Sequence, residues 1–339
     1  MTINRRQFVE QTTRAAVAAG TVGVGGNLAT SAAEADASAS DAPLPMIDTH
    51  QHLWDLSKFR LPWLKSAETL NRSFLTADYL AATEGLGVVK TVYMEVDVEP
   101  KQHVAEAEHV IALCRRHDNP MAAAVIGGRP GADDFRQYVA QFKNHAYVKG
   151  VRQVLFDTAP AREKAYVAGL RLLGTLGMSF DLCLPPKELL LGADLARQCP
   201  DVRFILDHCG NADPKAFSTR SQAKTAPAAE SPAHDAQQWR RDIAKVARQK
   251  NVVCKISGVV ARASKADWTA ADLAPIVNHC LEVFGPNRVM FGSDWPVCTR
   301  VASLQQWVAA LLEIIRGRPQ PQRRKLLHDN AERFYVLSK

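Results

Sequence analysis

Short runs of apolar residues recur along the chain from residue 46 onward, and more polar segments separate them. Several of these runs are continuously apolar, as expected of strands that are buried on both faces of a parallel sheet. The pattern predicts eight strands, at Met46–Thr49, Thr91–Val96, Ala122–Ile126, Gly150–Leu155, Ser179–Leu184, Arg203–Asp207, Val252–Ile256 and Val289–Gly292.

The segments between and after these strands carry apolar residues at helical spacing. The predicted helices are Lys101–His117, Asp133–Lys143, Glu188–Gln198, Ala236–Gln249, Ala271–Phe284, Leu304–Ile315 and Gln322–Phe334. Strands and helices that alternate in series predict an α/β fold, a (β/α)8 barrel of the TIM type, for which roughly 250 residues suffice. We therefore predict one barrel domain over residues 46–339. The pattern does not determine the conformations of two long connections, residues 51–75 and 209–234.

The segment before the barrel predicts export. Arg5 and Arg6 are followed by Phe8 at the offset of a twin-arginine motif, and then by a weakly apolar stretch rich in Gly and Ala. We expect residues 1–35 to be a Tat signal peptide that the Tat export machinery recognises, and residues 36–45 to be a linker. The expected location is periplasmic or exported. No stretch is apolar for long enough to predict a stable membrane span.

Charge and cysteine content narrow the classes of protein further. The net charge is +7, but the basic residues are dispersed and not interleaved with aromatic residues, so nucleic-acid binding is not expected. The seven cysteines are an odd number, scattered and without a CxxC motif, which argues against a disulfide framework. We expect most of them to be small residues of the core.

Polar residues stand where several predicted strands leave the core. His50 and His52 are two positions apart at the end of the first strand, so their side chains project to the same side. His208 follows the sixth strand and Asp294 the eighth. Because the carboxyl ends of barrel strands converge, these residues predict a site for one divalent metal, zinc by default, with Glu95 as a further candidate ligand. Asp294 is also placed to take a proton from water.

Four motifs together resemble one family: Ile-Asp-Thr-His-Gln-His-Leu-Trp-Asp, Lys-Gly-Val-Arg-Gln-Val, Ile-Leu-Asp-His-Cys-Gly and Met-Phe-Gly-Ser-Asp-Trp-Pro. They are similar to those of the amidohydrolase superfamily, in the branch of sugar lactonases and pyrone-dicarboxylate lactonases. The resemblance extends from Met46 to Tyr335. It implies a metal-dependent hydrolase in which water attacks a carbonyl, and a lactone or related cyclic ester as substrate. It also implies His50, His52 and His208 as imidazole positions, with Asp294 as the general base.

Further residues at the barrel mouth are candidates for catalysis and substrate binding. His208 is a candidate catalytic residue as well as a metal ligand. We expect Arg152 and Lys255 to bind a carboxylate or a developing oxyanion, because both are cations at strand ends. Trp54 and Trp295 are expected to contact a small-molecule substrate, either a lactone or a carboxylate.

The chain departs from the commoner superfamily pattern at two strands. Arg152 replaces a bridging lysine on the fourth strand, and the fifth strand has no histidine. The resemblance therefore implies at most one metal, and its branch includes metal-independent lactonases. Two other functions stay open: a metal-dependent decarboxylase of an aromatic or related acid, and a barrel that binds sugar acids without turnover. Asp294 argues against the second, because binding alone needs no base.

Overall fold

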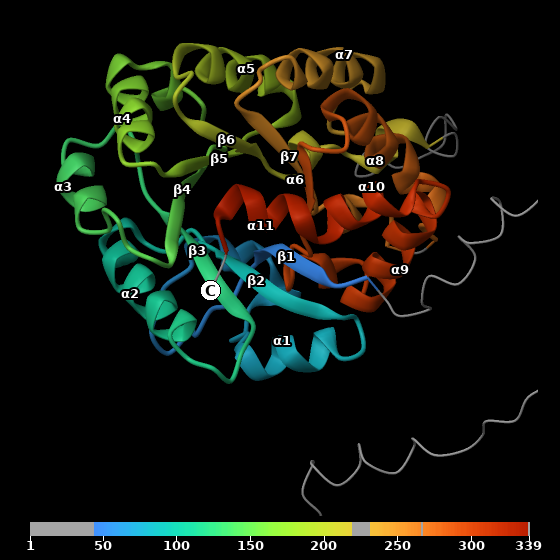
Figure 1. Ribbon diagram of the computed structural model, residues 1–339, viewed down its shortest axis with the longest axis horizontal. Helices are drawn as coiled ribbons and strands as arrows, with labels where there is room; N and C mark the ends of the chain where they lie inside the picture. The colour runs from blue at the N-terminus through green and yellow to red at the C-terminus, as the bar shows by residue number, and fades with distance from the viewer. Residues whose placement is uncertain (1–43, 219–230, 266, 338–339) are drawn as a thin grey trace, which may run out of the picture. The chain divides into compact units, whose positions relative to one another are not determined.

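The computed structural model describes residues 44–218, 231–265 and 267–337. The predicted signal peptide and all but the end of the predicted linker lie outside these residues. The described chain forms a parallel sheet whose eight strands are paired in sequence order, with helices around it (Figure 1). The strands are β1 Met46–Gln51, β2 Val88–Met94, β3 Met121–Gly127, β4 Val148–Val154, β5 Ser179–Cys183, β6 Arg203–Leu206, β7 Val252–Ile256 and β8 Val289–Phe291.

The sheet closes where the chain after β8 meets the end of β1. The backbone N–H of Asp294 donates to the carbonyl of His50 at 2.9 Å, and that of His52 donates to the carbonyl of Trp295 at 2.8 Å. The Thr49 hydroxyl adds a bond of 2.6 Å to the carbonyl of Phe291. These bonds join the first and last strands into a barrel. The predicted (β/α)8 fold and all eight predicted strands are therefore confirmed.

Helices follow the strands and cover the outside of the barrel in Figure 1. The α-helices are α1 Thr76–Thr83, α2 His103–Cys114, α3 Phe135–Ala140, α4 Lys164–Thr175, α5 Leu189–Gln198, α6 His208–Asn211, α7 Ala236–Ala247, α8 Ala270–Phe284, α9 Leu304–Ile315, α10 Gln320–Arg324 and α11 Asn330–Tyr335. A π-helical turn at Lys325–Asp329 connects the last two. The 3-10 turns are Pro62–Ser66, Glu68–Leu70, Pro100–Gln102, Pro160–Arg162, Pro186–Glu188, Pro214–Phe217, Val260–Arg262 and Val297–Arg300.

Three α-helices were not predicted: α1, α4 and the four-residue α6. Helix α1 has eight residues and buries only Tyr79, so its apolar pattern is weak. Helix α4 contains Gly169, and glycine lowers helix propensity by about 1 kcal/mol relative to alanine. A Cβ at Gly169 would lie 2.1 Å from the carbonyl oxygen of Pro130. The glycine thus serves the close packing of α4 on the loop after β3, which the local pattern does not show.

The core fills the barrel interior and the space between the sheet and the helices. The largest buried side chains include Trp239 on α7, Trp307 on α9 and Phe180 on β5. All seven cysteines are buried and unpaired, which confirms that they form no disulfide framework. Among the described residues, no helix is long and apolar enough to cross a membrane.

Candidate metal and catalytic centre

The two histidines of the first strand lie together at its carboxyl end. His50 belongs to β1, and His52 directly follows the last residue of that strand. Their rings stand edge to face with centroids 4.8 Å apart. Nδ1 of His52 lies 3.0 Å from the carbonyl oxygen of Met94. Because a carbonyl only accepts, Nδ1 carries the proton, and Nε2 of His52 keeps its lone pair for a ligand bond.

Asp294 reaches these histidines through a tight turn after β8. A Cβ on Gly292 would lie 2.7 Å from Cβ of His50, so only glycine allows this close approach. Asp294 itself has a left-handed φ of 55°. Its Oδ1 lies 3.3 Å from Nε2 of His52 and 3.8 Å from Nε2 of His50. Burial opposes ionisation of Asp294, but His208 and His52 outweigh it and lower its pKa, so the carboxylate is ionised at neutral pH.

A second strained turn positions His208. Residues 208–211 all have positive φ values, between 52° and 68°, which non-glycine residues seldom adopt. This turn brings the His208 ring to a centroid distance of 4.4 Å from the His50 ring. Nδ1 of His208 lies 3.1 Å from the hydroxyl oxygen of Ser257. Burial lowers the pKa of His208, and the carboxylates of Asp294 and Asp207 oppose this shift.

Asp207, which the sequence analysis did not select, lies on the other side of His50. Its Oδ1 is 3.4 Å from Nδ1 of His50 and 3.5 Å from Nζ of Lys255, and its Oδ2 is 3.5 Å from Nη1 of Arg152. Burial opposes ionisation, but Lys255 and His50 outweigh it and hold the pKa of Asp207 well below its ordinary value. The available signal was a carboxylate directly before His208 at the end of an apolar strand.

Two residues expected to bind substrate lie away from the cleft. The side chain of Lys255 points into the barrel, where it is fully buried and its Nζ lies 2.6 Å from Oδ2 of Asp181. Asp181 raises the pKa of Lys255 against the effect of burial, so it stays an ammonium ion. Trp295 is also buried, and its ring packs edge to face on Phe74 and Tyr79. The structure thus places Lys255 as an internal counter-ion and Trp295 as a packing residue.

Arg152 and Glu95 form a buried pair beside His50. Nε of Arg152 donates to Oε1 of Glu95 at 2.5 Å, and Nη2 donates to the Glu95 carbonyl at 2.7 Å. Oε2 of Glu95 accepts the backbone N–H of Asp97 at 2.7 Å. Both carboxylate oxygens of Glu95 are therefore engaged, and it holds Arg152 rather than joining the histidines. Nη1 of Arg152 lies 3.2 Å from Nε2 of His50.

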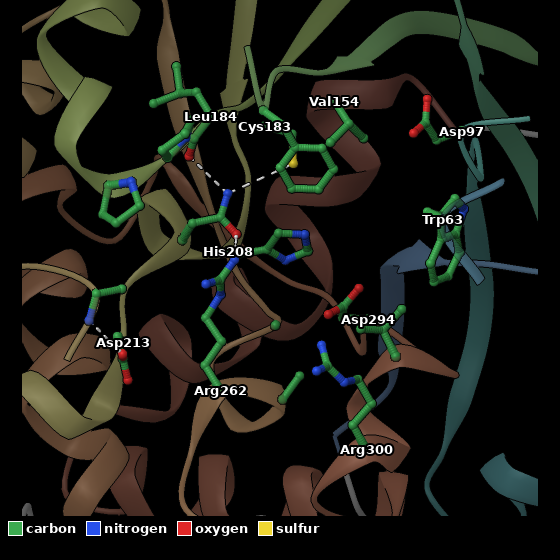
Figure 2. Close-up of a pocket in the computed structure, with 18 of the residues that line it drawn as sticks. Trp63, Asp97, Val154, Cys183, Leu184, His208, Asp213, Arg262, Asp294 and Arg300 are labelled. Atoms are coloured by element: carbon green, nitrogen blue, oxygen red, sulfur yellow. Dashed lines mark hydrogen bonds between the residues drawn. The ribbon is translucent and has the colours of Figure 1, made fainter. Parts of the chain in front are cut away.

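A cleft of about 800 Å³ opens at this end of the barrel, and Figure 2 shows many of the side chains that line it. Five residues from the predicted set line it: His52, Trp54, Arg152, His208 and Asp294. His50, Glu95, Lys255 and Trp295 lie behind this lining. The cleft also includes residues that the sequence analysis did not single out, among them Trp63, Asp97, Arg262 and Arg300. Trp63 lies in the long connection after β1. The other three belong to none of the motifs found in the sequence.

The family model for amidohydrolases matches residues 47–337, which is nearly the whole barrel. The chain belongs to the amidohydrolase family. This confirms the resemblance found in the motifs, and it makes the protein a hydrolase.

Known proteins similar to this amidohydrolase cover most of its length. An uncharacterised protein, y4mH, from Sinorhizobium fredii is 28% identical over 313 residues, which are 86% of this chain and 98% of that protein. An L-fucono-1,5-lactonase from Burkholderia multivorans is 29% identical over 290 residues, 79% of this chain and 87% of that protein. A crystal structure of an amidohydrolase from Burkholderia multivorans with bound zinc has a TM-score of 0.73 and 24% identity, and covers 87% of this chain and 100% of that one.

The side chains of this amidohydrolase can hold one metal ion. Ligand atoms of His50, His52 and Asp294 all lie within 4.8 Å of one another, and each residue is buried. Two imidazoles and a carboxylate are ligands that suit zinc. Nη1 of Arg152 contacts Nε2 of His50, the nitrogen that would bind the metal. Metal binding would therefore break this contact, while the bond from Arg152 to Glu95 would keep the arginine in place. A second set, His50, Asp207 and His208, meets the same distance limit, and only His208 of the three lines the cleft.

Proposed function

We propose that this amidohydrolase opens a lactone ring with water and uses one divalent metal ion, zinc, for the reaction. The observation that carries the proposal is the contact of 3.3 Å between Asp294 and His52, two buried residues that both line the cleft. It places an ionised carboxylate beside an available imidazole nitrogen, with Arg152 on the same cleft. The lactonase among the similar proteins supports the choice of substrate.

His50, His52 and Asp294 would hold the metal, with His208 beside them. When bound, a divalent metal supplies Lewis acidity, which polarises a carbonyl and makes water more acidic. The buried position of the three ligands limits competition from solvent water. The zinc in the crystal structure from Burkholderia multivorans supports the choice of metal.

The side chains of the chain account for the movement of protons. Asp294 takes a proton on a carboxylate oxygen as water attacks the lactone carbonyl carbon. The C–O bond of the ring then breaks, and Asp294 returns the proton to the ring oxygen that leaves as a hydroxyl group. Arg152 lines the cleft with Nη1 at 3.2 Å from Nε2 of His50, and it stabilises the negative charge on the carbonyl oxygen. The products are a carboxylate and an alcohol in one molecule.

Metal analysis combined with a panel of lactones tests this function. We expect about one zinc ion per chain, release of acid from at least one lactone, and loss of both metal and activity in His52→Ala. His117→Ala changes an exposed histidine outside the cleft and serves as the matched control. Full activity in protein that contains no metal would contradict the metal requirement. Binding of lactones without acid release would contradict the hydrolase assignment.

We also propose that the precursor is exported through the Tat pathway. The proposal rests on Arg5, Arg6 and Phe8 and on the Gly- and Ala-rich stretch after them. Replacing both arginines with lysine should leave the precursor in the cytoplasm, as cell fractionation can measure. The same replacement at Arg240 and Arg241, an adjacent pair on α7, should leave export unchanged, since both lie on the barrel. Unchanged export of the variant without the arginine pair would contradict the proposal.

A further inference from the structure

The cleft is lined by more basic than acidic side chains. Six basic and three acidic residues line it within the described part of the chain. Arg152 is paired with Glu95, and Lys215 lies 3.8 Å from Asp213. Once Asp294 is assigned to the reaction, these pairings leave basic side chains without a neighbouring carboxylate. Arg262 and Arg300 are two of these, and Figure 2 shows both of them on the same cleft as His208 and Asp294.

We propose that Arg262 and Arg300 form a subsite for an oxyanion, a carboxylate or phosphate group carried by the lactone substrate. The proposal deepens the proposed function, on which the lactone part of it rests. It assigns an anionic lactone, rather than a neutral sugar lactone, as the preferred substrate. Guanidinium groups suit this role because their planar set of N–H donors matches the oxygens of either group.

The two arginines come from neighbouring elements of the barrel mouth. Arg262 ends the turn Val260–Arg262 after β7, and Arg300 ends the turn Val297–Arg300 after β8. These two turns pack against each other. The loops after the seventh and eighth strands are where barrels of this type frequently bind phosphate groups. Figure 2 shows both side chains extending from the ribbon toward the level of His208 and Asp294.

Neither guanidinium is neutralised by the described protein. The one side-chain hydrogen bond that Arg262 makes with a described residue goes to a neutral acceptor, Oδ1 of Asn211, at 2.9 Å. Arg300 has no hydrogen bond or ion pair with any described residue. Both side chains are exposed to the cleft and keep donors free for a ligand. A second positive charge beside the first is unfavourable until an anion lies between them.

The side of the cleft away from the two arginines carries an acidic side chain. Asp97 and Trp63 lie there, away from Arg262 in Figure 2. The Asp97 carboxylate accepts no bond from any described side chain, and Trp63 donates its ring N–H to the Val96 carbonyl. A carboxylate at this end repels an anion and accepts hydroxyl donors. The substrate should therefore place its anionic group at the two arginines and its hydroxyl groups toward Asp97.

A matched pair of lactones tests the subsite. The first is the γ-lactone of α-hydroxyglutaric acid, which carries a free carboxylate, and the second is its carboxamide, which has the same shape without the charge. We expect wild-type protein to prefer the carboxylate by about tenfold or more in kcat/KM. Arg262→Gln and Arg300→Gln should each lose most of this preference, chiefly through KM. Arg316→Gln removes an exposed charge outside the cleft and should retain it.

Further measurements identify the anion and separate the two proposals. A larger kcat/KM for a phosphorylated sugar lactone than for the carboxylate lactone assigns the subsite to phosphate, and the reverse assigns it to carboxylate. Calorimetric titration of the opened product, α-hydroxyglutarate, reads binding without turnover. Binding that Arg300→Gln abolishes supports the subsite even if no lactone is hydrolysed, in which case only the proposed function fails. Equal hydrolysis of the charged and neutral lactones, unchanged in both arginine variants, overturns the subsite and leaves the function standing.

Discussion

The carboxylate of Asp207 lies 3.4 Å from Nδ1 of His50, while the other ring nitrogen of that histidine faces Asp294 at 3.8 Å. Nη1 of Arg152 lies 3.2 Å from Nε2, and a guanidinium can only donate, so Nε2 is the acceptor. Nζ of Lys255 lies 3.4 Å from Nδ1 of the same ring, so a cationic donor faces each ring nitrogen. Asp207 is the carboxylate on the Nδ1 side, and a proton on Nδ1 would leave Nε2 available on the side of the metal site.

Asp207→Asn should weaken metal binding by about tenfold to a hundredfold, because a carboxylate behind a ligating histidine orients the ring and strengthens it as a ligand. Competition with a chromophoric chelator measures this affinity. The variant should also unfold at a lower temperature, because the buried ammonium ion of Lys255 loses one of its neighbouring negative charges. A lower melting temperature with unchanged metal affinity would show that Asp207 serves stability alone. Asp118→Asn, at an exposed site, is the control.

Asp294→Asn should reduce kcat by about a hundredfold to ten-thousandfold, which corresponds to about 3–5 kcal/mol of barrier. Asparagine keeps the shape of the side chain but cannot take the proton from water. Steady-state kinetics on a good lactone, with metal content measured on the same sample, checks this. A loss below tenfold with unchanged substrate binding would mean that another group takes the proton.

Lys255→Met should lower stability and leave KM nearly unchanged, although Lys255 was expected from the sequence to bind substrate. The side chain is fully buried, and its loss leaves Asp181 without its partner at 2.6 Å. Breaking a buried ion pair in this way costs about 3–5 kcal/mol. Chemical denaturation measures the free energy of unfolding, and kinetics measures KM. A large rise in KM in a variant of normal stability would restore the substrate role.

Glu106 on α2 makes stability depend on pH. Burial raises its pKa from 4.5 to about 8, so the folded protein keeps a proton there that the unfolded chain releases above pH 4.5. The stabilising contribution is full below pH 4.5 and is lost as the pH rises to about 8. Glu106→Gln should abolish this decline, because glutamine can still accept from Tyr93 and Val96. Parallel declines in unfolding free energy for both proteins would assign the pH dependence to other groups.

The sequence alone was enough to predict the barrel and the side chains at its carboxyl end. Strands buried on both faces leave continuous apolar runs, and this local property needs no knowledge of neighbouring strands. The alternation of side chains along a strand likewise placed His50 and His52 on one side. His208 and Asp294 were found because each lies within a few residues of the end of such a run. Their convergence then follows from the closed topology, in which all strand ends meet at one mouth.

Only the tertiary structure decided which polar residues reach the cleft and which serve one another inside the barrel. Lys255 and Arg152 both lie on strands. How far each lies below the barrel mouth, and which residues it contacts, depends on the register between neighbouring strands. The alternation of side chains along one strand does not encode that register. Lys255 therefore meets Asp181, and Asp207 meets His50, inside the barrel. Arg262 and Arg300 are brought together by two packed turns whose backbone is set by contacts distant in sequence. Such positions leave no local pattern, because their geometry exists only once the barrel has closed.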